Sequence, residues 1–275
     1  TSIGVFLSTA TNLTSGNTFY VRAYATNAGG TAYGIPISFT TPTHCGTVTD
    51  YDGNVYNTVY IGAQCWMKEN LKTTHYSNGA AIPAGGDGNY SDKYYFKYNH
   101  DNANMAKYGL LYTWQATMNG AGSSDNNPSG IQGICPSGWH VPSNSEWCEL
   151  ENYIEPGIDV NCNSTGYRGS MAKKLAAPRE WTSYTQNPFA PGYWQNDTTG
   201  FDISGFSALP GGYYYYGSSP YFRELNDEAY FWTCTRNPND SSHIFYRYLG
   251  YDQSGVGRST NYINYYAYSI RCVKN

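Results

Sequence analysis

Apolar and polar positions alternate in short runs along most of this chain, a pattern that predicts β-strands joined by turns. From Phe19 to Thr26, Phe, Val and Ala alternate with Tyr, Arg and Thr, and "NAGG" then supplies a turn before "TAYGIPISFTT". Two further β-rich runs flank "DYDGN" at residues 50–54, where the Asp-Gly pair favours a tight hairpin turn over a calcium loop. From Gly200 onward, short alternations and Gly-rich loops dominate.

Helical periodicity is rare in the chain. The clearest helix begins in "PSNSEWCELENYIEPG", where Ser143 and Glu146 have capping-box spacing, an apolar face follows, and Pro156 stops the pattern. A short helix is expected within residues 169–177, and residues 109–119 fit a helix or a strand. A few helices among many short strands indicate an α+β fold.

The chain is expected to contain two parts, residues 1–43 and residues 44–275, because "TPTHCG" supplies a Pro-containing break and the first cysteine. The stretch "LTSGNTFYVRAYATNAGG" resembles the end of a fibronectin type III-like or immunoglobulin-like module, including a Leu-x-x-Gly-x-x-Tyr-type corner. A sandwich of this class has about seven strands. The first part is therefore either an incomplete module or one that packs on the second part.

Composition narrows the class of partner. Charged residues make up 13% of the chain and the net charge is -4, so no basic stripe exists for nucleic acid. Solubility rests instead on Ser, Thr, Asn, Gly and 30 tyrosines. No apolar run reaches the roughly 20 residues of a transmembrane segment, and the first residues do not form a signal sequence. We expect a processed or trimmed part of a secreted protein.

Six motifs, taken in order, make the second part recognisable. They are "GNVYNTVYIGAQCWMKENLKTTHY", "YGLLYTWQA", "GICPSGWHVPSNSEWCELENYI", "GFSALPGGYY", "AYFWTCT" and "YSIRCVKN". Together they resemble the FISUMP-type major paralogous domain of exported bacterial surface proteins, over about residues 45–275. "HVPSNSEWCEL" is also similar to the helix entry of the formylglycine-generating-enzyme-like branch of the C-type lectin fold. The resemblance implies a C-type-lectin-like domain on the cell surface, with a twisted antiparallel sheet, two main helices and long loops.

The seven cysteines contain no C-x-x-C spacing, so disulfides are favoured over a zinc site or a thioredoxin-like pair. Spacing does not fix their connectivity, and an odd number leaves at least one cysteine out. As a hypothesis that accompanies the resemblance, Cys45 pairs with Cys65, Cys135 with Cys272 and Cys148 with Cys162. Cys234 is then the unpaired cysteine.

The sequence gives little support for catalysis. The histidines lack metal-ligand spacing, and no nucleophile elbow or phosphate-binding loop occurs, so no cofactor and no metal are expected. In "RNPND", Arg236 stands where a calcium-binding lectin would have a bidentate carboxylate. An enzyme of the formylglycine-generating type, with Cys234 and Cys272 as its reactive cysteines, remains an alternative. A structural subunit of a pilus or surface assembly is another.

Thirteen of the 30 tyrosines lie between residues 213 and 268. The run at 213–216 cannot be wholly buried, because a strand sends alternate side chains to opposite faces. Tyrosine with Ser, Gly and Asn is typical of antibody combining loops, which predicts a surface that binds an extracellular protein or glycan. Cross-strand tyrosine pairs that only stabilise a sheet, by about 0.2–1 kcal/mol each, are the alternative. The expected ligand-binding residues are Tyr214, Tyr216, Tyr221, Arg223, Arg236, Asn237, Asn239, Tyr246, Tyr248, Tyr251, Tyr262, Asn264 and Tyr265.

The C-terminal stretch "RSTNYINYYAYSIRC" is expected to contain a loop followed by a strand. Residues 258–266 show no clean alternation and read as a ring-bearing loop, whereas residues 268–273 alternate as a final strand. The Tyr/Asn/Ser mixture would also suit a receptor diversified by a retroelement that mutates adenine-containing codons. That hypothesis rests on composition alone.

Overall fold

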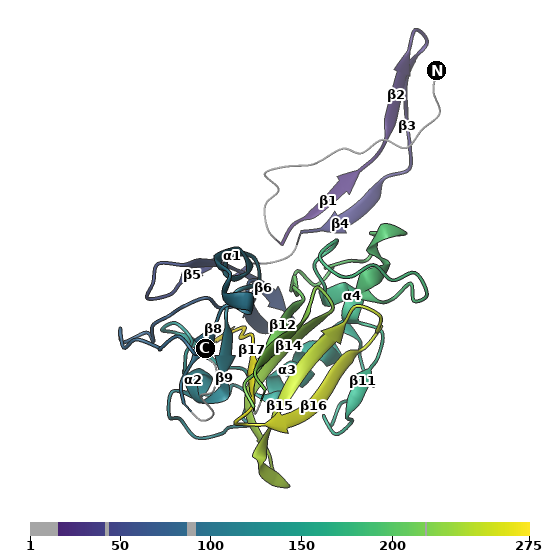
Figure 1. Ribbon diagram of the computed structural model, residues 1–275. Coiled ribbons are helices and arrows are strands. Elements are labelled where there is room, and N and C mark those ends of the chain that lie inside the picture. Colours follow the sequence, from purple (N-terminus) through teal and green to yellow (C-terminus); the bar gives the residue numbers. More distant parts are fainter. Residues whose placement is uncertain (1–15, 42–43, 87–91, 218) are drawn as a thin grey trace. The chain divides into compact units, whose positions relative to one another are not determined.

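The computed structural model describes residues 16–41, 44–86, 92–217 and 219–275 (Figure 1). The chain forms two compact units, Thr1–His44 and Cys45–Asn275, which divide one residue after the boundary expected from the sequence. Each unit has its own strands, and they are described separately.

The N-terminal unit consists of two antiparallel strand pairs. β1 (Thr18–Val21) pairs with β4 (Ile37–Thr40), and β2 (Tyr24–Asn27) pairs with β3 (Gly30–Tyr33) through the expected "NAGG" turn. Nearly all of these strand residues are exposed. The described part of this unit therefore buries no core of its own.

The C-terminal unit is α+β, as expected, with many strands and few helices. The α-helices among its described residues are α1 (Asn102–Tyr108), α2 (Trp114–Met118), α3 (Asn144–Ile154) and α4 (Ala172–Leu175). Two 3-10 helices, η1 (Tyr98–His100) and η2 (Pro191–Gln195), complete them. None of the helices in the described ranges is long and apolar enough to cross a membrane.

Two sheets make up the rest of this unit. The smaller has the order β10-β18-β7-β6-β5, and the larger has the order β11-β16-β15-β14-β12-β17-β9-β8, with β13 paired to β12. The smaller sheet contains β5 (Thr47–Thr49), β6 (Val55–Ile61), β7 (Gln64–Met67), β10 (Trp139–His140) and β18 (Val273–Lys274). The larger contains β8 (Tyr95–Phe96), β9 (Leu111–Thr113), β11 (Gly166–Arg168), β12 (Gly211–Tyr215), β13 (Tyr221–Leu225), β14 (Glu228–Asn237), β15 (Asp240–Gly250), β16 (Val256–Tyr262) and β17 (Tyr266–Tyr268). Pairing is antiparallel except between β12 and β14, which meet in parallel at Gly212 and Ala229.

The helix α3 begins where the sequence predicts. The Ser143 hydroxyl accepts a hydrogen bond from the Glu146 amide, and the Glu146 carboxylate accepts one from the Ser143 amide, which completes the capping box. The apolar face of α3 contacts β6 of the smaller sheet and β14 of the larger. Its residues Trp147 and Leu150 join a core that includes Trp66 and Phe231. In Figure 1, α3 lies behind β14, β15 and β16.

Other expectations from the sequence have mixed outcomes. The helix expected within residues 169–177 is the single turn α4, and residues 109–119 contain both the strand β9 and the helix α2. Helix α1 was not expected; its N-cap is Asp101, whose side chain accepts from the Ala103 amide. The Asp-Gly hairpin turn is confirmed, since the Asp50 amide donates to the Asn54 carbonyl between β5 and β6.

The predicted loop at residues 258–266 is wrong for residues 258–262 and 266, which belong to strands, whereas residues 263–265 form a turn. Strand β16 continues to Tyr262 and pairs with β15 from Gly257 opposite Tyr248 to Tyr262 opposite His243. No apolar alternation marks this strand, because Arg258 faces the interior and glycine and polar residues fill the other face.

The predicted final strand at residues 268–273 is also interrupted. Strand β17 ends at Tyr268, the next residues are fully buried, and β18 then joins the other sheet. The C-terminal segment therefore crosses from one sheet to the other.

All three expected disulfides are confirmed: Cys45–Cys65, Cys135–Cys272 and Cys148–Cys162. Cys234 is free and buried, as expected for the cysteine left over. Burial raises the pKa of the Cys234 thiol to about 12, so this thiol stays protonated at neutral pH.

Candidate functional site

The strands β14 and β15 present tyrosines together with the fully buried Trp232 on one face, whereas their other face packs on α3. Tyr230 lies opposite Tyr248, and Trp232 lies opposite Tyr246. Side chains alternate along a strand, so the intervening Arg247 points the other way, toward α3. The face opposite α3 is therefore rich in aromatic rings.

One row of rings runs across four strands of the larger sheet. Tyr167 on β11 and Tyr248 on β15 both flank Gly257 of β16, and their ring centroids are 4.8 Å apart. The Tyr248 ring then stacks on Tyr230 at 5.8 Å. A Cβ atom on Gly257 would lie 2.1 Å from the Tyr248 ring, so the glycine leaves the space in which this ring lies flat.

A second row crosses β13, β12 and β17. Tyr215 lies opposite both Tyr221 and Tyr266, with ring centroid distances of 5.0 Å and 5.2 Å. Tyr213 connects the two rows, because its ring is 5.1 Å from Tyr230 and 5.8 Å from Tyr266. The rings thus form a continuous set of contacts across the sheet.

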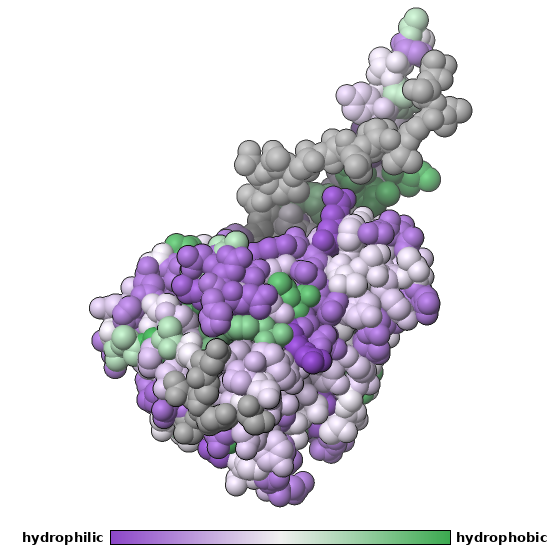
Figure 2. All heavy atoms as spheres, in the orientation of Figure 1, coloured by the Kyte–Doolittle hydropathy of each residue, from purple (hydrophilic) through white to green (hydrophobic). Residues whose placement is uncertain are grey.

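We call this set the tyrosine face. It comprises Tyr167, Tyr213, Tyr215, Tyr221, Tyr230, Tyr246, Tyr248, Tyr262, Tyr265 and Tyr266. Every member is partly or largely exposed, and the fully buried Tyr268 packs beneath Tyr230 and Tyr246. Figure 2 shows the surface over β14, β15 and β16 as mostly pale, near the middle of the hydropathy scale. A half-exposed ring that carries a hydroxyl can offer both apolar contact and hydrogen bonds.

Carboxylates lie among these rings. The Glu228 carboxylate accepts a hydrogen bond from the Tyr230 hydroxyl, and burial raises the pKa of Glu228, assisted by the negative charge of Glu224. Burial likewise raises the pKa of Tyr246 to about 12. The Tyr246 hydroxyl is therefore protonated at neutral pH, while Glu228 supplies an acceptor among the rings.

Two expected ligand residues are not on this surface. Tyr214 and Tyr216 are 1% and 0% exposed, and both rings pack on Phe96. The strand β12 alternates, so Tyr213 and Tyr215 face outward in their place. Our prediction chose the wrong pair from a run of four identical residues.

The other expected residues fall into three groups. Tyr221, Tyr246, Tyr248, Tyr262 and Tyr265 belong to the tyrosine face, and the guanidinium of Arg223 lies 4.8 Å above the Tyr221 ring. Tyr251 is apart from them and packs edge-on against Tyr184.

The third group consists of Arg236, Asn237 and Asn239 at the turn between β14 and β15, which projects beyond the neighbouring strands (Figure 1), and of Asn264 between β16 and β17. Asn237 closes this turn by accepting from the Asn239 amide. Arg236 stacks on Trp114 and, with Ile263, lines a cavity of about 750 Å³. Asn264 accepts a hydrogen bond from Gln115, another residue that lines this cavity.

Sequence reasoning missed five members of the tyrosine face: Tyr167, Tyr213, Tyr215, Tyr230 and Tyr266. Tyr230, Phe231 and Trp232 are all aromatic, so the sequence shows no apolar–polar alternation there that would distinguish the outward residue from the inward one. Tyr167 lies far away in the sequence and joins only through the pairing of β11 with β16. Knowledge of strand register was needed to find it.

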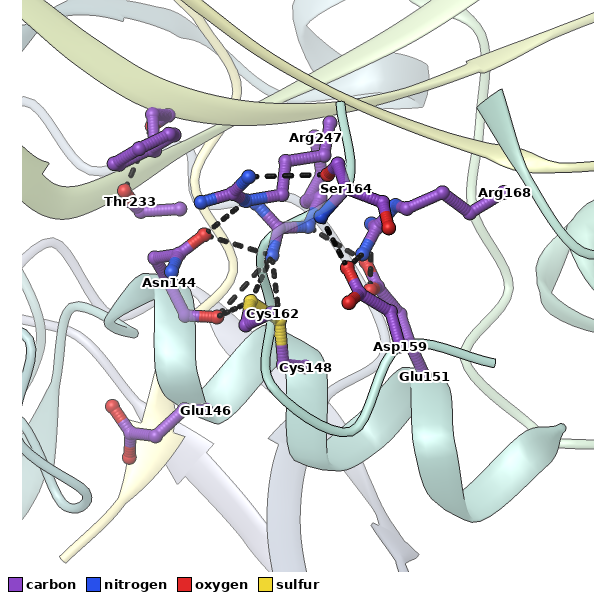
Figure 3. A network of polar contacts seen from close by, with 12 residues as sticks. Asn144, Glu146, Cys148, Glu151, Asp159, Cys162, Ser164, Arg168, Thr233 and Arg247 are labelled. Carbon is purple, nitrogen blue, oxygen red and sulfur yellow. Dashed lines mark hydrogen bonds and ion pairs between the residues drawn. A yellow bond between two sulfur atoms is a disulfide. The ribbon is translucent and has the colours of Figure 1, made fainter. Parts of the chain in front are cut away.

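A charged network lies on the opposite side of the same strands (Figure 3). Glu151 of α3 is fully buried and pairs with Arg247 and with Arg168, each at 2.6 Å. Arg168 also contacts Asp159 at 3.3 Å, and Arg258 donates to the Asn144 side chain. These contacts connect α3 to the inner face of β11, β15 and β16, and so hold the sheet that carries the tyrosine face.

Comparison with known proteins gives one clear relationship. No curated protein and no solved structure matches the chain. The model of the Fibrobacter succinogenes major domain matches residues 59–274, which is most of the sequence and nearly all of the C-terminal unit. The chain with its tyrosine face therefore belongs to the Fibrobacter succinogenes major domain family.

Proposed function

We propose that this chain belongs to a secreted bacterial surface protein whose C-terminal unit binds an extracellular glycan through the tyrosine face, without catalysis. The observation that carries the proposal is the continuous contact of ten partly exposed tyrosine rings, most of which project from the side of the larger sheet opposite α3. Rigid amphipathic rings give a large contact area at low entropic cost. Three disulfides are consistent with an extracellular protein.

A glycan fits this chemistry better than a protein partner. A sugar ring has C–H groups on its faces and hydroxyls around its edge, so it can lie on a tyrosine ring while its hydroxyls meet phenols and carboxylates. Glu228 and Glu224 supply such acceptors. The core of a protein interface is more apolar and poorer in charge. Capture of a protein in place of a glycan is therefore an outcome that the test must separate.

The proposed fold is C-type-lectin-like. Support comes from the resemblance of "HVPSNSEWCEL" and from the capped helix α3, which packs beneath an antiparallel sheet. In such a domain, a stable scaffold carries variable strands and loops at the ligand surface. The tyrosine face occupies this position in the proposal.

The test compares two matched double variants. Tyr221→Ala with Tyr265→Ala removes two exposed rings of the tyrosine face, which are 36% and 38% exposed. Tyr60→Ala with Tyr153→Ala removes two exposed tyrosines outside that face. Each ring removed should cost about 0.5–1.5 kcal/mol of binding free energy, so the loss of two rings should weaken glycan binding roughly five- to 150-fold. We expect this weakening in the first variant only.

Glycan arrays and titration calorimetry measure this difference, and circular dichroism verifies that both variants are folded. Equal weakening in the two double variants would show that binding does not depend on the tyrosine face. If the wild type binds no glycan on the array but captures a protein in pulldowns, the proposal that the ligand is a glycan is wrong. Self-assembly into fibres through the same tyrosines would favour the pilus subunit expected as an alternative.

The enzymatic alternative loses its main sequence argument. A formylglycine-generating enzyme would require Cys234 and a second reactive thiol near the C-terminus, but Cys272 is bonded to Cys135. Cys234 is buried and its thiol pKa is raised to about 12 by burial, which disfavours the nucleophilic thiolate.

Diversification of the tyrosine face remains a proposal that rests on composition. If it occurs, paralogues should vary at outward positions such as Tyr230, Tyr246 and Tyr248 and keep inward Phe231 and Arg247. Sequencing the gene and its flanks decides this. Flanks without a reverse transcriptase gene or template repeat would reject the retroelement.

A further inference from the structure

Buried charges in the network of Figure 3 do not balance. Arg168, Arg247 and Arg258 are each at most 5% exposed, whereas the buried carboxylates that face them within the described part of the chain are Glu151 and Asp159. The network therefore buries three positive charges against two negative ones. Burial is costly for an unpaired charge, and it lowers the pKa of Arg247 to about 10.

Both sulfurs of the Cys148–Cys162 disulfide lie beside this excess charge. Arg247 Nη2 is 3.3 Å from Cys148 Sγ and 3.7 Å from Cys162 Sγ. The neighbouring Arg247 Nη1 is buried and has no hydrogen-bond partner among the described residues. The guanidinium is thus placed to stabilise a negative charge on either sulfur.

The same disulfide is accessible from solvent. A shallow cavity of about 300 Å³ is lined by both cysteines together with Ser145, Glu149 and Asn152, and it includes residues 160 and 161. Cys162 is partly exposed, whereas Cys148 is 5% exposed. Cys162 also has φ 53°, in the left-handed region that is unfavourable for a residue with a Cβ atom.

We propose that the Cys148–Cys162 disulfide is a thiol–disulfide exchange site, which an external dithiol reduces more readily than it reduces the other two disulfides. One thiolate of the dithiol attacks Cys162 Sγ, the S–S bond breaks, and its electron pair remains on Cys148 Sγ beside Arg247. The second thiolate then attacks the mixed disulfide, releases the Cys162 thiolate and leaves the reagent as a cyclic disulfide. Two electrons pass from the dithiol to the protein.

Electrostatics favours this product. A thiolate at Cys148 balances the third arginine, so reduction makes the network neutral. A cation beside a cysteine lowers its pKa from about 8.5 to between about 3.5 and 7.5. Glu149 at the cavity and the exposed Asp125 near Arg258 oppose the effect, but both carboxylates are better solvated than the arginines.

The chain contains two internal controls. Cys45–Cys65 is also partly exposed, with Cys65 at 4%, but no arginine among the described residues donates a hydrogen bond to its sulfurs. Cys135–Cys272 is fully buried. Cys45–Cys65 therefore shows how readily a partly exposed disulfide is reduced when no arginine lies beside it. Cys135–Cys272 shows the behaviour of a buried disulfide.

The first experiment equilibrates the native protein with reduced and oxidised dithiothreitol at pH 7, in a series of ratios. Acid quenching, alkylation and peptide mass spectrometry then report the reduced fraction of each cysteine. We expect the equilibrium constant for reducing Cys148–Cys162 to exceed that of Cys45–Cys65 at least tenfold, about 30 mV, while circular dichroism remains native. The proposal is wrong if the two constants agree within threefold, or if Cys148 and Cys162 are reduced only as the protein unfolds.

A second experiment isolates the role of Arg247. In Cys162→Ser, the Cys148 thiol remains beside the guanidinium, and in Cys45→Ser, the Cys65 thiol is the matched control. Rates of alkylation by iodoacetamide against pH should give a midpoint for Cys148 at least one pH unit below that for Cys65. Adding Arg247→Met, which leaves Glu151 paired with Arg168 and two buried arginines facing two buried carboxylates, should abolish this difference. An unchanged midpoint in the folded double variant would overturn the role of the arginine.

Discussion

Replacing Glu151 by glutamine would remove the carboxylate that receives two buried arginines. The side chain is 0% exposed, and its oxygens lie 2.6 Å from Arg247 Nε and 2.6 Å from Arg168 Nη2. Two unit charges about 4 Å apart attract by about 4 kcal/mol at an effective dielectric constant of 20. Desolvation of the charges offsets part of this attraction. Loss of one partner from a buried pair costs about 3–5 kcal/mol, because the remaining charge stays buried.

The assay is urea unfolding of Glu151→Gln followed by circular dichroism, with thermal unfolding beside it. For a unit of this size, a loss of about 3–5 kcal/mol in the free energy of unfolding lowers Tm by roughly 6–20 °C. Glu149→Gln is the matched control: it lies on the same helix but at a cavity, where it accepts from Asn127, and it should cost about 1 kcal/mol or less. A change of less than about 1 kcal/mol for Glu151→Gln would refute the reasoning that Glu151 compensates buried charge.

Three further predictions concern separate parts of the C-terminal unit. Burial opposes a charge on His140, but hydrogen bonds with Glu146 and Asn275 outweigh it and raise the His140 pKa. This stabilisation is therefore present below about pH 6.5, the usual value for unfolded histidine, and is lost as pH rises through the folded pKa; His140→Gln should flatten that part of the stability–pH curve from urea unfolding. Ser143→Ala should cost about 1 kcal/mol in the same assay by removing the cap of α3. Gly257→Ala should cost about 1–3 kcal/mol and change the near-ultraviolet dichroism, since its Cβ meets the Tyr248 ring, whereas Gly122→Ala, with open space around it, should change neither.

The parts of the fold that the sequence predicted correctly depend on local signals. The capping box at Ser143 and the hairpin turn at residues 50–54 involve residues a few positions apart, so their chemistry is visible in one short stretch. The choice between Tyr213 and Tyr214 depends on strand phase, which a run of identical residues does not reveal. Glu151 and Arg247 are 96 positions apart, and charged residues on inward positions mimic an exposed strand. The tyrosine face could therefore be anticipated as a composition, but not residue by residue.

The Cys135–Cys272 disulfide has a mechanical consequence. It joins residues 137 positions apart, and the segment between them contains α3 and every strand from β10 to β17. Tension applied between the two ends of this chain would pass through the bridge and bypass that segment. If extended at roughly 3.5 Å per residue, this segment would be more than about 450 Å long, and the disulfide prevents that extension. Because the Cys45–Cys65 disulfide likewise bypasses β5 and β6, a pulling force would load β7, β8 and β9, and it would reach the ring-bearing strands where β9 pairs with β17.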